Sequence, residues 1–391
     1  MSTRSLTPKE FVVKLASAVD LQLAGMSIKL IYSAMAVYVL AMFAHLFEWT
    51  FGSAGAVARR SIEQTSLAET VGATSKAGQV VRQARVTVAS GSGGSTTLTR
   101  TVVAGKGATV VTSGRSASDQ IDGPGAAGSS PKADLAGRIA ISLTALGALL
   151  HIAGVVTRGL SVMRWPWGNM YEFSCAFALA MVLVYLGLLA AKAPVRWLGV
   201  PVTFGAVLTL GLAVTVLYTA AGQLVPALHS YWLGIHVTAA TACVGAFYTA
   251  FAATFLFLGK DTYERRRTLG QATGPFGSPA SIWERLPAAA TLDRFSYRVN
   301  AIVFPLYTFT VIAGAIWAEA AWGKYWEWDP KETWSFITWV AYAAYLHARA
   351  TAGWRGRKAA YVALVAFACM LFNYYGINIF VTGKHSYAGV G

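Results

Sequence analysis

The stretch 322–334, which reads WGKYWEWDPKETW, holds the densest group of side chains that could do chemistry in this chain. Trp322 and Trp326 are one helical turn apart, and Trp328 follows two residues later. Single aromatic residues are ordinary at a membrane boundary, because their rings settle at the headgroup level, so an aromatic belt is one interpretation. The density of rings beside charged side chains favours another, a site for a large planar ligand that stacks on the rings and keeps a polar edge toward water.

The histidines are the second set of candidates. A histidine inside an apolar helix costs free energy unless a partner satisfies it, so each is a functional candidate, with a helix–helix hydrogen bond as the alternative. His236 lies a few residues into an apolar run and His385 just past the end of another, both level with the Trp-rich segment 322–334. Two neutral imidazoles flanking an aromatic platform predict a bis-histidine haem site, since haem iron takes axial ligands from both sides of the ring.

His347 is expected at a different depth. It lies about fourteen residues into its apolar run, or about 20 Å along a helix at 1.5 Å per residue, close to Arg349. It cannot ligate the same iron as the outer pair, so a haem bound there would occupy a second, inward site. His45, His151 and His229 have no convergent partner in the sequence, and we expect them to be packing or supporting residues.

Membrane-spanning helices must position these groups. Of the 391 residues 55% are hydrophobic and only 13% are charged, and several apolar runs are long enough to cross a hydrocarbon core of about 30 Å. Strand-type alternation is not sustained in these runs. We predict an all-α polytopic membrane protein of about eight transmembrane helices, with the Trp-rich segment outside the membrane between the sixth and the seventh. The expected spans are 28–47, 136–157, one that follows the turn 158–170 and ends near 191, 197–219, 231–258, 299–318, 333–350 and 359–381.

Positive charge indicates the orientation of these spans. The formal net charge is +15, but Lys and Arg cluster between the apolar runs, which is typical of cytoplasmic loops and speaks against a nucleic-acid partner. The Trp-rich segment and the tail with His385 are then extracytoplasmic, although Arg158 and Arg164 sit against the rule. The basic loops expected in the cytoplasm are 192–196, 259–298 and 353–358.

Composition also predicts the domain boundaries. We expect a polar lead with the first span over 1–50, a low-complexity polar insert over 51–134, and a membrane domain with seven spans over 135–391. The insert is rich in Gly, Ser, Thr and Ala, so we expect disorder there, with short runs such as Ala84–Val88 as candidate strands. No Cys-x-x-Cys pair exists, so Cys175, Cys243 and Cys369 are expected to be buried structural thiols.

The Trp-rich segment resembles the signature of the tryptophan-rich (WWD) haem-handling proteins, and its Pro-Lys-Glu-Thr-Trp ending is similar to the CcsA family of System II cytochrome c biogenesis. Three further stretches agree with that family in order and spacing. They are Gly168-Asn-Met-Tyr-Glu172, Ser230-Tyr-Trp-Leu-Gly-Ile-His-Val237 and Lys384-His-Ser-Tyr387. The resemblance covers roughly residues 135 to 388, which makes 135–391 a haem-handling domain, and leaves the insert out.

This resemblance implies roles for the matching residues. His236 and His385 would be the external axial ligands of haem iron, and His347 the inner haem site, with its counterpart ligand on a partner protein. The haem platform would consist of Trp322, Gly323, Tyr325, Trp326, Trp328, Asp329 and Trp334. Supporting roles would fall to Lys331, Glu332, Asn169, Tyr171 and Glu172.

An activity is implied as well. The chain would bind haem b non-covalently at the outer face of the plasma (inner) membrane and present it for covalent attachment to the Cys-x-x-Cys-His motif of apocytochrome c. It would be a subunit of a holocytochrome c synthase, with a CcsB (ResB) type membrane partner and a thioredoxin-like thiol reductant. Two alternatives stay open: a transporter of haem or another planar amphiphile without attachment activity, and a respiratory-chain subunit with permanent b-type haems.

Overall fold

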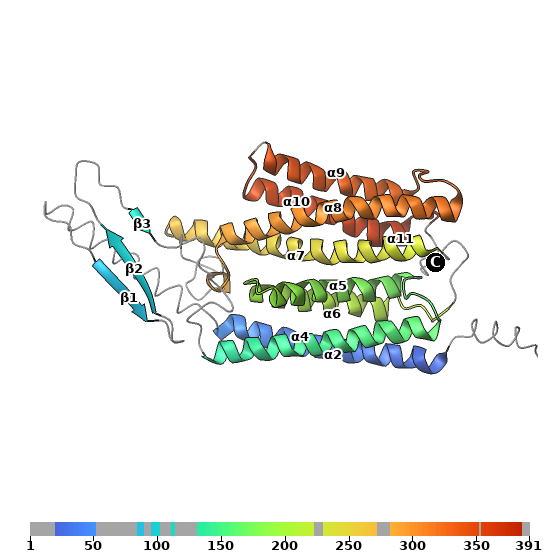
Figure 1. Ribbon diagram of the computed structural model, residues 1–391, viewed down its shortest axis with the longest axis horizontal. Coiled ribbons are helices and arrows are strands. Elements are labelled where there is room, and N and C mark those ends of the chain that lie inside the picture. Colours follow the sequence, from blue (N-terminus) through green and yellow to red (C-terminus); the bar gives the residue numbers. More distant parts are fainter. Residues whose placement is uncertain are drawn as a thin grey trace, which may run out of the picture. The chain divides into compact units, whose positions relative to one another are not determined.

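Helices make up most of the structure (Figure 1), a computed structural model that describes residues 20–51, 84–89, 95–101, 111–113, 131–222, 230–271, 282–351 and 353–384. The main helices are α2 (Leu21–Phe51), α4 (Pro131–Ser161), α5 (Met170–Ala190), α6 (Gly199–Thr215), α7 (Tyr231–Thr268), α8 (Ala289–Trp322), α9 (Pro330–Ala350) and α10 (Arg357–Leu371). Short helical turns are η2 (Arg196–Leu198), η4 (Ile282–Arg285), η5 (Phe372–Gly376) and α11 (Ile377–Phe380). The chain forms two compact units, a larger one of Met1–His45, Ile139–Leu258 and Leu292–Gly391 and a smaller one of Leu46–Arg138 and Gly259–Thr291.

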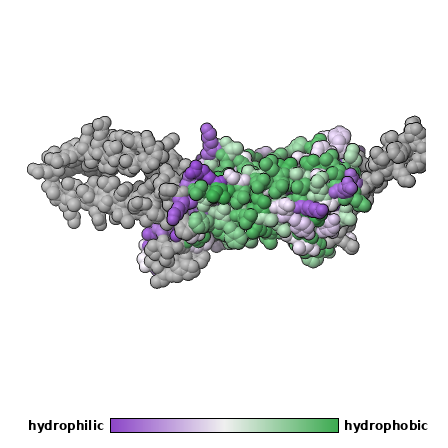
Figure 2. Space-filling view, turned by 90° about the horizontal axis from the view of Figure 1, so that it is seen from below, coloured by the Kyte–Doolittle hydropathy of each residue, from purple (hydrophilic) through white to green (hydrophobic). Residues whose placement is uncertain are grey.

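Seven helical segments among the described residues are long and apolar enough to cross a membrane. Hydrophobic side chains cover the middle of the helices in Figure 2, and hydrophilic ones gather toward their ends. The chain is therefore a multi-pass helical membrane protein, as the sequence predicts. The seven segments are Leu21–Thr50, Lys132–Ser161, Met170–Ala190, Arg196–Thr215, Tyr231–Thr268, Ala289–Trp322 and Arg357–Phe380.

The helix α9 differs from these seven. Its 21 residues make about 30 Å of helix at 1.5 Å per residue, which is enough to span a membrane. His347, Arg349 and the polar atoms of its aromatic rings lower its mean hydropathy, so it does not count with the seven. Seven of the eight expected spans thus match strongly apolar segments, and the span expected on α9 stays a prediction.

The basic loop expected over 259–298 is wrong in its extent. The helix α7 continues to Thr268, and α8 already begins at Ala289. Hydropathy marks where side chains cease to suit lipid, whereas the helical backbone continues as long as polar side chains support it. An ion pair one turn apart, between Arg265 Nε and Asp261 Oδ2 at 2.9 Å, provides such support at the end of α7.

In the smaller unit, hydrogen bonds tie the segment before α8 to neighbouring helices. Arg285 donates to the backbone oxygens of Trp49, at 3.2 Å, and Thr50 at the end of α2. Lys260 Nζ on α7 donates to the backbone oxygen of Trp283 at 2.7 Å. These bonds to carbonyl groups give cationic side chains partners beyond the apolar part of the helices.

Three strands lie within the insert. They are β1 (Ala84–Ala89), β2 (Ser95–Thr101) and β3 (Val111–Ser113), and they form one antiparallel sheet in the order β1-β2-β3, with Val86 opposite Leu98. The strand predicted over 84–88 is confirmed. The disorder expected for the rest of 51–134 is wrong for β2, β3 and the start of α4 at Pro131, and most of the other residues lie outside the described ranges.

In the larger unit the helices alternate in direction, so the connections gather at two ends (Figure 1). One end carries the turn 162–169, the Trp-rich segment and residues 381–384, and we call it the site end. The backbone N–H of Asp20 donates to the oxygen of Ser161 at 2.8 Å, which places the start of α2 there as well. The motif stretches that lie far apart in the sequence therefore meet at one end of the unit.

Candidate functional site

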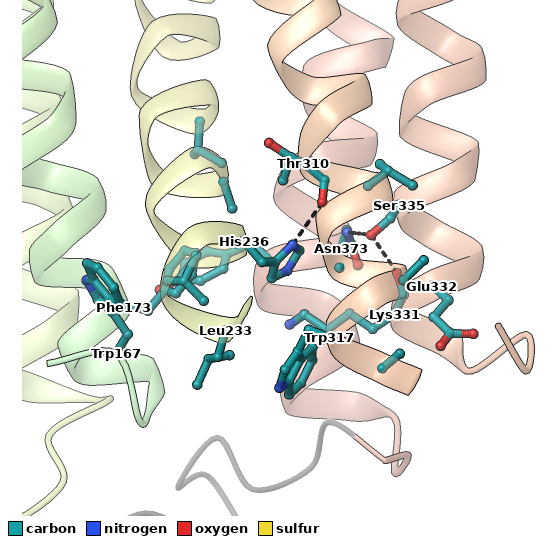
Figure 3. A pocket seen from close by; sticks show the side chains of 18 of the residues that line it. Trp167, Phe173, Leu233, His236, Thr310, Trp317, Lys331, Glu332, Ser335 and Asn373 are labelled. Atoms are coloured by element: carbon teal, nitrogen blue, oxygen red, sulfur yellow. Dashed lines mark hydrogen bonds between the residues drawn. The ribbon is translucent and has the colours of Figure 1, made fainter. Parts of the chain in front are cut away.

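A cavity of about 210 Å³ lies at the site end (Figure 3). Its walls come from the turn before α5 and from α5, α7, α8, the Trp-rich segment, α9, α10, η5 and α11. The structure thus brings together residues from three of the four stretches that carry the family resemblance. Six residues singled out from the sequence line this cavity: Asn169, His236, Tyr325, Trp326, Lys331 and Glu332.

His236 reaches the cavity from α7 with a fixed tautomer. Its Nδ1 lies 2.9 Å from the backbone oxygen of Thr310 on α8, and because a carbonyl oxygen only accepts, Nδ1 must carry a proton. In the neutral imidazole the lone pair is then on Nε2, and a histidine that ligates a metal through one nitrogen usually donates from the other in this way. His236 is therefore prepared to act as a metal ligand.

Two residues of α8 shape the position of this imidazole. Trp317 stacks on the ring of His236 with centroids 6.1 Å apart and planes at 12°. A Cβ atom at Gly314 would lie 2.8 Å from the same ring, closer than a Cβ can approach. Glycine at 314 is therefore required for the observed position of His236.

The start of α9 explains two acids of the Trp-rich segment. Asp329 is the N-cap, Pro330 is the first helical residue, and Asp329 and Glu332 form a capping box. The Glu332 carboxylate accepts from the backbone N–H of Asp329 at 3.1 Å and from that of Glu327 at 2.9 Å. These carboxylates determine where α9 begins. The sequence Asp-Pro-Lys-Glu is a helix-start signature that we had not recognised in the sequence.

Lys331, between the capping residues, has a different environment. Its side chain lines the cavity, and Figure 3 shows its ammonium end directed into it. Burial lowers the pKa of this ammonium to about 7, and the Asp329 carboxylate opposes that shift. Lys331 lies in the first turn of α9, before the apolar part of the helix.

The aromatic rings of the Trp-rich segment divide between the cavity and its surroundings. Tyr325 and Trp326 line the cavity. Trp322 packs edge-on against Trp317 at 4.9 Å between centroids, and Trp334 packs against η5. The cavity wall is therefore built from part of the expected platform, while the other rings hold the segment in place.

Trp328 does not line the cavity. Its side chain is 64% exposed, and its φ of 60° lies in the left-handed region that bulky residues rarely adopt. Gly323 has a φ of 75°, which glycine adopts without strain. These two residues turn the chain between α8 and α9 and leave the Trp328 ring at the surface, edge-on to Trp326 at 5.6 Å.

A buried ion-pair network holds the turn before α5. The Glu172 side chain is 0% exposed, and its carboxylate lies 2.8 Å from Nε of Arg158 and 2.8 Å from Nη1 of Arg164. Asn169 caps α5 by accepting from the backbone N–H of Glu172 at 2.9 Å, and Tyr171 lies under the Arg158 guanidinium at 5.2 Å. The two arginines that sit against the positive-inside rule are therefore structural charges that share one carboxylate.

The last described residues lie against the Trp-rich segment. Lys384 Nζ pairs with the carboxylate of Glu327 and lies 5.7 Å from the ring centroid of Trp322. A Cβ atom at Gly383 would lie 2.6 Å from the Asp329 carboxylate, so the backbone passes close to the N-cap of α9. The tail is thus held at the site end up to residue 384.

Two of the six histidines, His229 and His385, fall outside the described residues. The pairing of His385 with His236 at one iron therefore stays a prediction. Lys384, the last described residue, contacts the Trp-rich segment through Trp322.

His347 lies far along α9 from the cavity. Seventeen residues separate it from the start of the helix, or about 25 Å at 1.5 Å per residue. Its side chain is exposed on the face that also exposes Phe336 and Val340, and two residues further on Arg349 pairs with Asp293 at 2.7 Å. His347 is therefore too distant to share a metal with the cavity.

His45 and His151 are sealed between helices, each with 0% exposure. His151 Nδ1 lies 3.4 Å from the Tyr38 hydroxyl, and His45 Nε2 lies 3.3 Å from Thr144 Oγ1. A Cβ atom at Gly199 would lie 2.3 Å from the His45 ring. These contacts agree with the packing role expected for the two residues.

Much of the cavity lining was missed in the sequence. Trp167 in the turn before α5 and Trp317 on α8 both line it, and Trp317 could have been noticed because it lies five residues before the Trp-rich segment. Asn373 lines it from η5, a π-helical turn, and donates to Ser335 Oγ at 2.9 Å. Such turns are frequent at functional sites, but no sequence signal marks this one.

The chemistry of the cavity follows from its contents. It offers one histidine prepared for metal ligation, flat aromatic walls and one lysine. Among the described residues no group of three or more His, Cys, Asp or Glu gathers to hold a metal ion. This donor set fits an iron porphyrin, because the ring brings four nitrogen ligands of its own and needs only axial ones from protein.

Comparison with known proteins agrees with this reading. The family described as Cytochrome C assembly protein matches residues 167–385. A protein named cytochrome c biogenesis protein CcsA from Gloeobacter violaceus is 38% identical over 283 residues, which cover 61% of this chain and 83% of the relative. Proteins of the same name from Synechococcus elongatus and Pyropia yezoensis are 36% and 32% identical, over 63% and 64% of this chain and 88% and 91% of the relatives.

Proposed function

This chain belongs to the CcsA family of cytochrome c biogenesis proteins, and we propose that it binds haem in the cavity and presents it there for covalent attachment to apocytochrome c. The observation that carries the proposal is the position of His236. Its Nδ1–H is engaged by the Thr310 carbonyl, and its ring lines an aromatic cavity. Haem b, bound non-covalently, is the cargo rather than a resident cofactor.

His236 supplies one axial nitrogen to the iron, and His385 supplies the second. The contact of Lys384 with Trp322 and Glu327 supports this pairing, because it brings the tail to the site end. Trp317, Tyr325 and Trp326 stack on or border the porphyrin faces. The protein's contribution is to bind and orient haem, while the iron chemistry belongs to haem itself.

Attachment is a thiol addition. Each cysteine of the apocytochrome Cys-x-x-Cys-His motif adds its S–H across one vinyl C=C bond, so that sulfur bonds to one carbon and hydrogen to the other. This step has no net oxidation, but it needs both cysteines as free thiols, a condition that a thioredoxin-like reductant maintains. The substrate histidine then replaces one of the two axial ligands, which releases haem from the cavity.

We place the site end outside the plasma (inner) membrane. Basic residues such as Arg355, Arg357 and Lys358 lie at the opposite end, and the rule of positive cytoplasmic loops favours this orientation. His347 lies toward that opposite end on an exposed face of α9, where a CcsB (ResB) type partner can supply a second ligand. Haem would then pass from an inward to an outward site within the complex.

The test is a dithionite-reduced absorption spectrum of the chain purified with its partner. We expect a low-spin bis-histidine spectrum for the wild type, and loss of most haem in His236→Ala and His385→Ala. Added imidazole should restore the spectrum, because it replaces the missing ligand. The matched control is His151→Ala, a buried membrane histidine away from the cavity, which should keep its haem.

Two outcomes would contradict the proposal. Full haem content and normal cytochrome c maturation in both ligand variants would show that the ligands are assigned wrongly. Haem that stays tightly bound through His236 and never reaches a co-expressed apocytochrome c would favour the respiratory-chain subunit with permanent b-type haems.

A further inference from the structure

Lys331 is a charged side chain of the cavity that has no hydrogen-bond or ion-pair partner for its ammonium group among the described residues. Among the described lining residues only Lys331 and Glu332 carry a formal charge at neutral pH. Glu332 accepts from two backbone N–H groups in the capping box. No hydrogen bond or ion pair joins Lys331 Nζ to a described residue, and its end points into the cavity (Figure 3).

The local environment disfavours a cation at this position. Lys331 is the second helical residue of α9, where the positive end of the helix dipole repels an ammonium group. Burial adds a desolvation cost, which is reflected in the pKa of about 7. Asp329 acts in the opposite direction, and it already caps the helix. Packing alone would be served better by Met or Leu, so the ammonium points to an anionic ligand.

We propose that Lys331 binds a carboxylate of the molecule that enters the cavity and thereby sets which edge of that molecule faces the start of α9. This deepens the proposed function and rests on it: for haem, the carboxylates are the two propionates. The propionate edge then lies toward Lys331, and the vinyl groups on the remaining edge face the opening used by apocytochrome c. Lys331 is in this sense a positioning residue, since it touches the ligand but not the reacting carbons.

The chemistry of the cavity favours a carboxylate over other anionic groups. A single ammonium on a flexible side chain holds a point charge, and the remaining lining is apolar, aromatic or uncharged. A propionate on a flat apolar ring matches this distribution, because the ring covers the aromatic wall while the carboxylate meets the cation. Phosphate-bearing ligands usually engage several cationic or backbone N–H donors, which this cavity does not gather among its described lining residues.

The experiment compares haem with haem dimethyl ester, in which both carboxylates are esterified. The full chain, purified in detergent, is titrated with each ligand, and binding is followed by the absorption change and by tryptophan quenching. We expect the wild type to prefer haem about tenfold, or about 1.4 kcal/mol. Lys331→Met should bind both ligands equally, and Lys331→Arg should restore the preference. The matched control is Lys324→Met, which removes an exposed lysine of the same segment that pairs with Glu327 at 2.6 Å.

The outcomes separate this inference from the proposed function. If both ligands bind through His236 with equal affinity in the wild type, or if Lys331→Met keeps the full preference for haem, this inference alone is overturned. A wild-type chain that binds neither ligand in a His236-dependent way overturns the proposed function together with this inference. Loss of preference in Lys324→Met as well would show a general charge effect and also count against it.

Discussion

His236 on α7 and His151 on α4 both belong to segments apolar enough to cross a membrane, and each places Nδ1 at hydrogen-bonding distance from a neighbouring helix. The two differ in what surrounds the rest of the ring. His151 is completely buried, with Tyr38 as its partner, whereas His236 is half-buried and lines a cavity. A histidine in a membrane helix is therefore not a functional group by its presence alone. Space beside the second nitrogen is the distinguishing feature.

The two regions are also held together differently. Around His45 and His151 the helices approach closely, with a glycine under the His45 ring and hydrogen bonds to neutral side chains. The cavity depends on capped helix ends and on the buried charges of Glu172 and its two arginines. A cavity that must admit a ligand cannot be stabilised by packing side chains into it. Its walls are therefore held by polar contacts on the side away from the cavity.

The largest expected effect comes from removing the buried ion pairs that support the cavity walls. Glu172→Gln leaves Arg158 and Arg164 buried without a counter-charge, and we expect a loss of stability of about 3–5 kcal/mol, measured by thermal unfolding of the purified chain. The control is Asp134→Asn, which breaks an exposed pair with Arg138 and should cost less than about 0.5 kcal/mol. If the two variants were equally stable, the buried charges of Glu172 and its arginines would not stabilise the cavity walls, and this difference between the two regions would not hold.

A smaller effect is expected from the same substitution, glycine to alanine, made beside each of two histidines. Gly199→Ala would place a Cβ 2.3 Å from His45, and Gly314→Ala one 2.8 Å from His236. We expect Gly199→Ala to lower stability by about 1–3 kcal/mol through overpacking and to leave haem binding unchanged. Gly314→Ala should weaken haem binding about tenfold, because the cavity lets the imidazole move instead of straining the fold.

The control for this pair is Gly211→Ala, since a Cβ there meets nothing within 4 Å. Haem titration and thermal unfolding are measured on all three variants. The comparison fails if Gly314→Ala loses stability but keeps its haem affinity, because the cavity would then be as rigid as the sealed helix pair.

The smallest expected effect depends on pH. Because burial lowers the pKa of Lys331 to about 7, the ammonium is present below that pH and is lost as pH rises through it. The preference for haem over its dimethyl ester should therefore be greatest near pH 6 and decline several-fold by pH 9. Lys331→Met should show no such decline, and the same decline in that variant would assign it to another group. The other titratable side chains that line the cavity are His236, Tyr307, Tyr325, Glu332 and Tyr374, and Asp329 acts on Lys331 from the start of its own helix.

Local patterns in the sequence were enough to predict the helices and part of the site. Apolar runs predicted the spans because membrane crossing depends on the side chains of a single segment. The Trp-rich segment and His236 were recognised by their composition and spacing. The ends of α7 and α8 were misjudged because hydropathy does not report helical hydrogen bonds beyond the apolar core.

The roles of single residues were harder to predict. Asp329 was assigned to the haem platform and Glu332 to the supporting residues, although their spacing around Pro330 already indicates a capping box. Trp328, which was expected in the haem platform, does not line the cavity and has its ring at the surface, so its role stays a prediction. A count of aromatic and charged residues cannot tell a wall of the site from its supports.

By itself the sequence determined the family and the helical membrane architecture, and it predicted which histidines could ligate iron, because these follow from motifs and from local hydropathy. Only the tertiary structure decided which of these residues share a cavity. The His236 tautomer depends on a carbonyl 74 positions away, and the wall formed by α5 and η5 depends on a hydrogen bond between Ser174 and Tyr374, 200 positions apart. Such contacts are set by how the helices pack, and packing depends on residues far apart in the sequence that no local pattern connects.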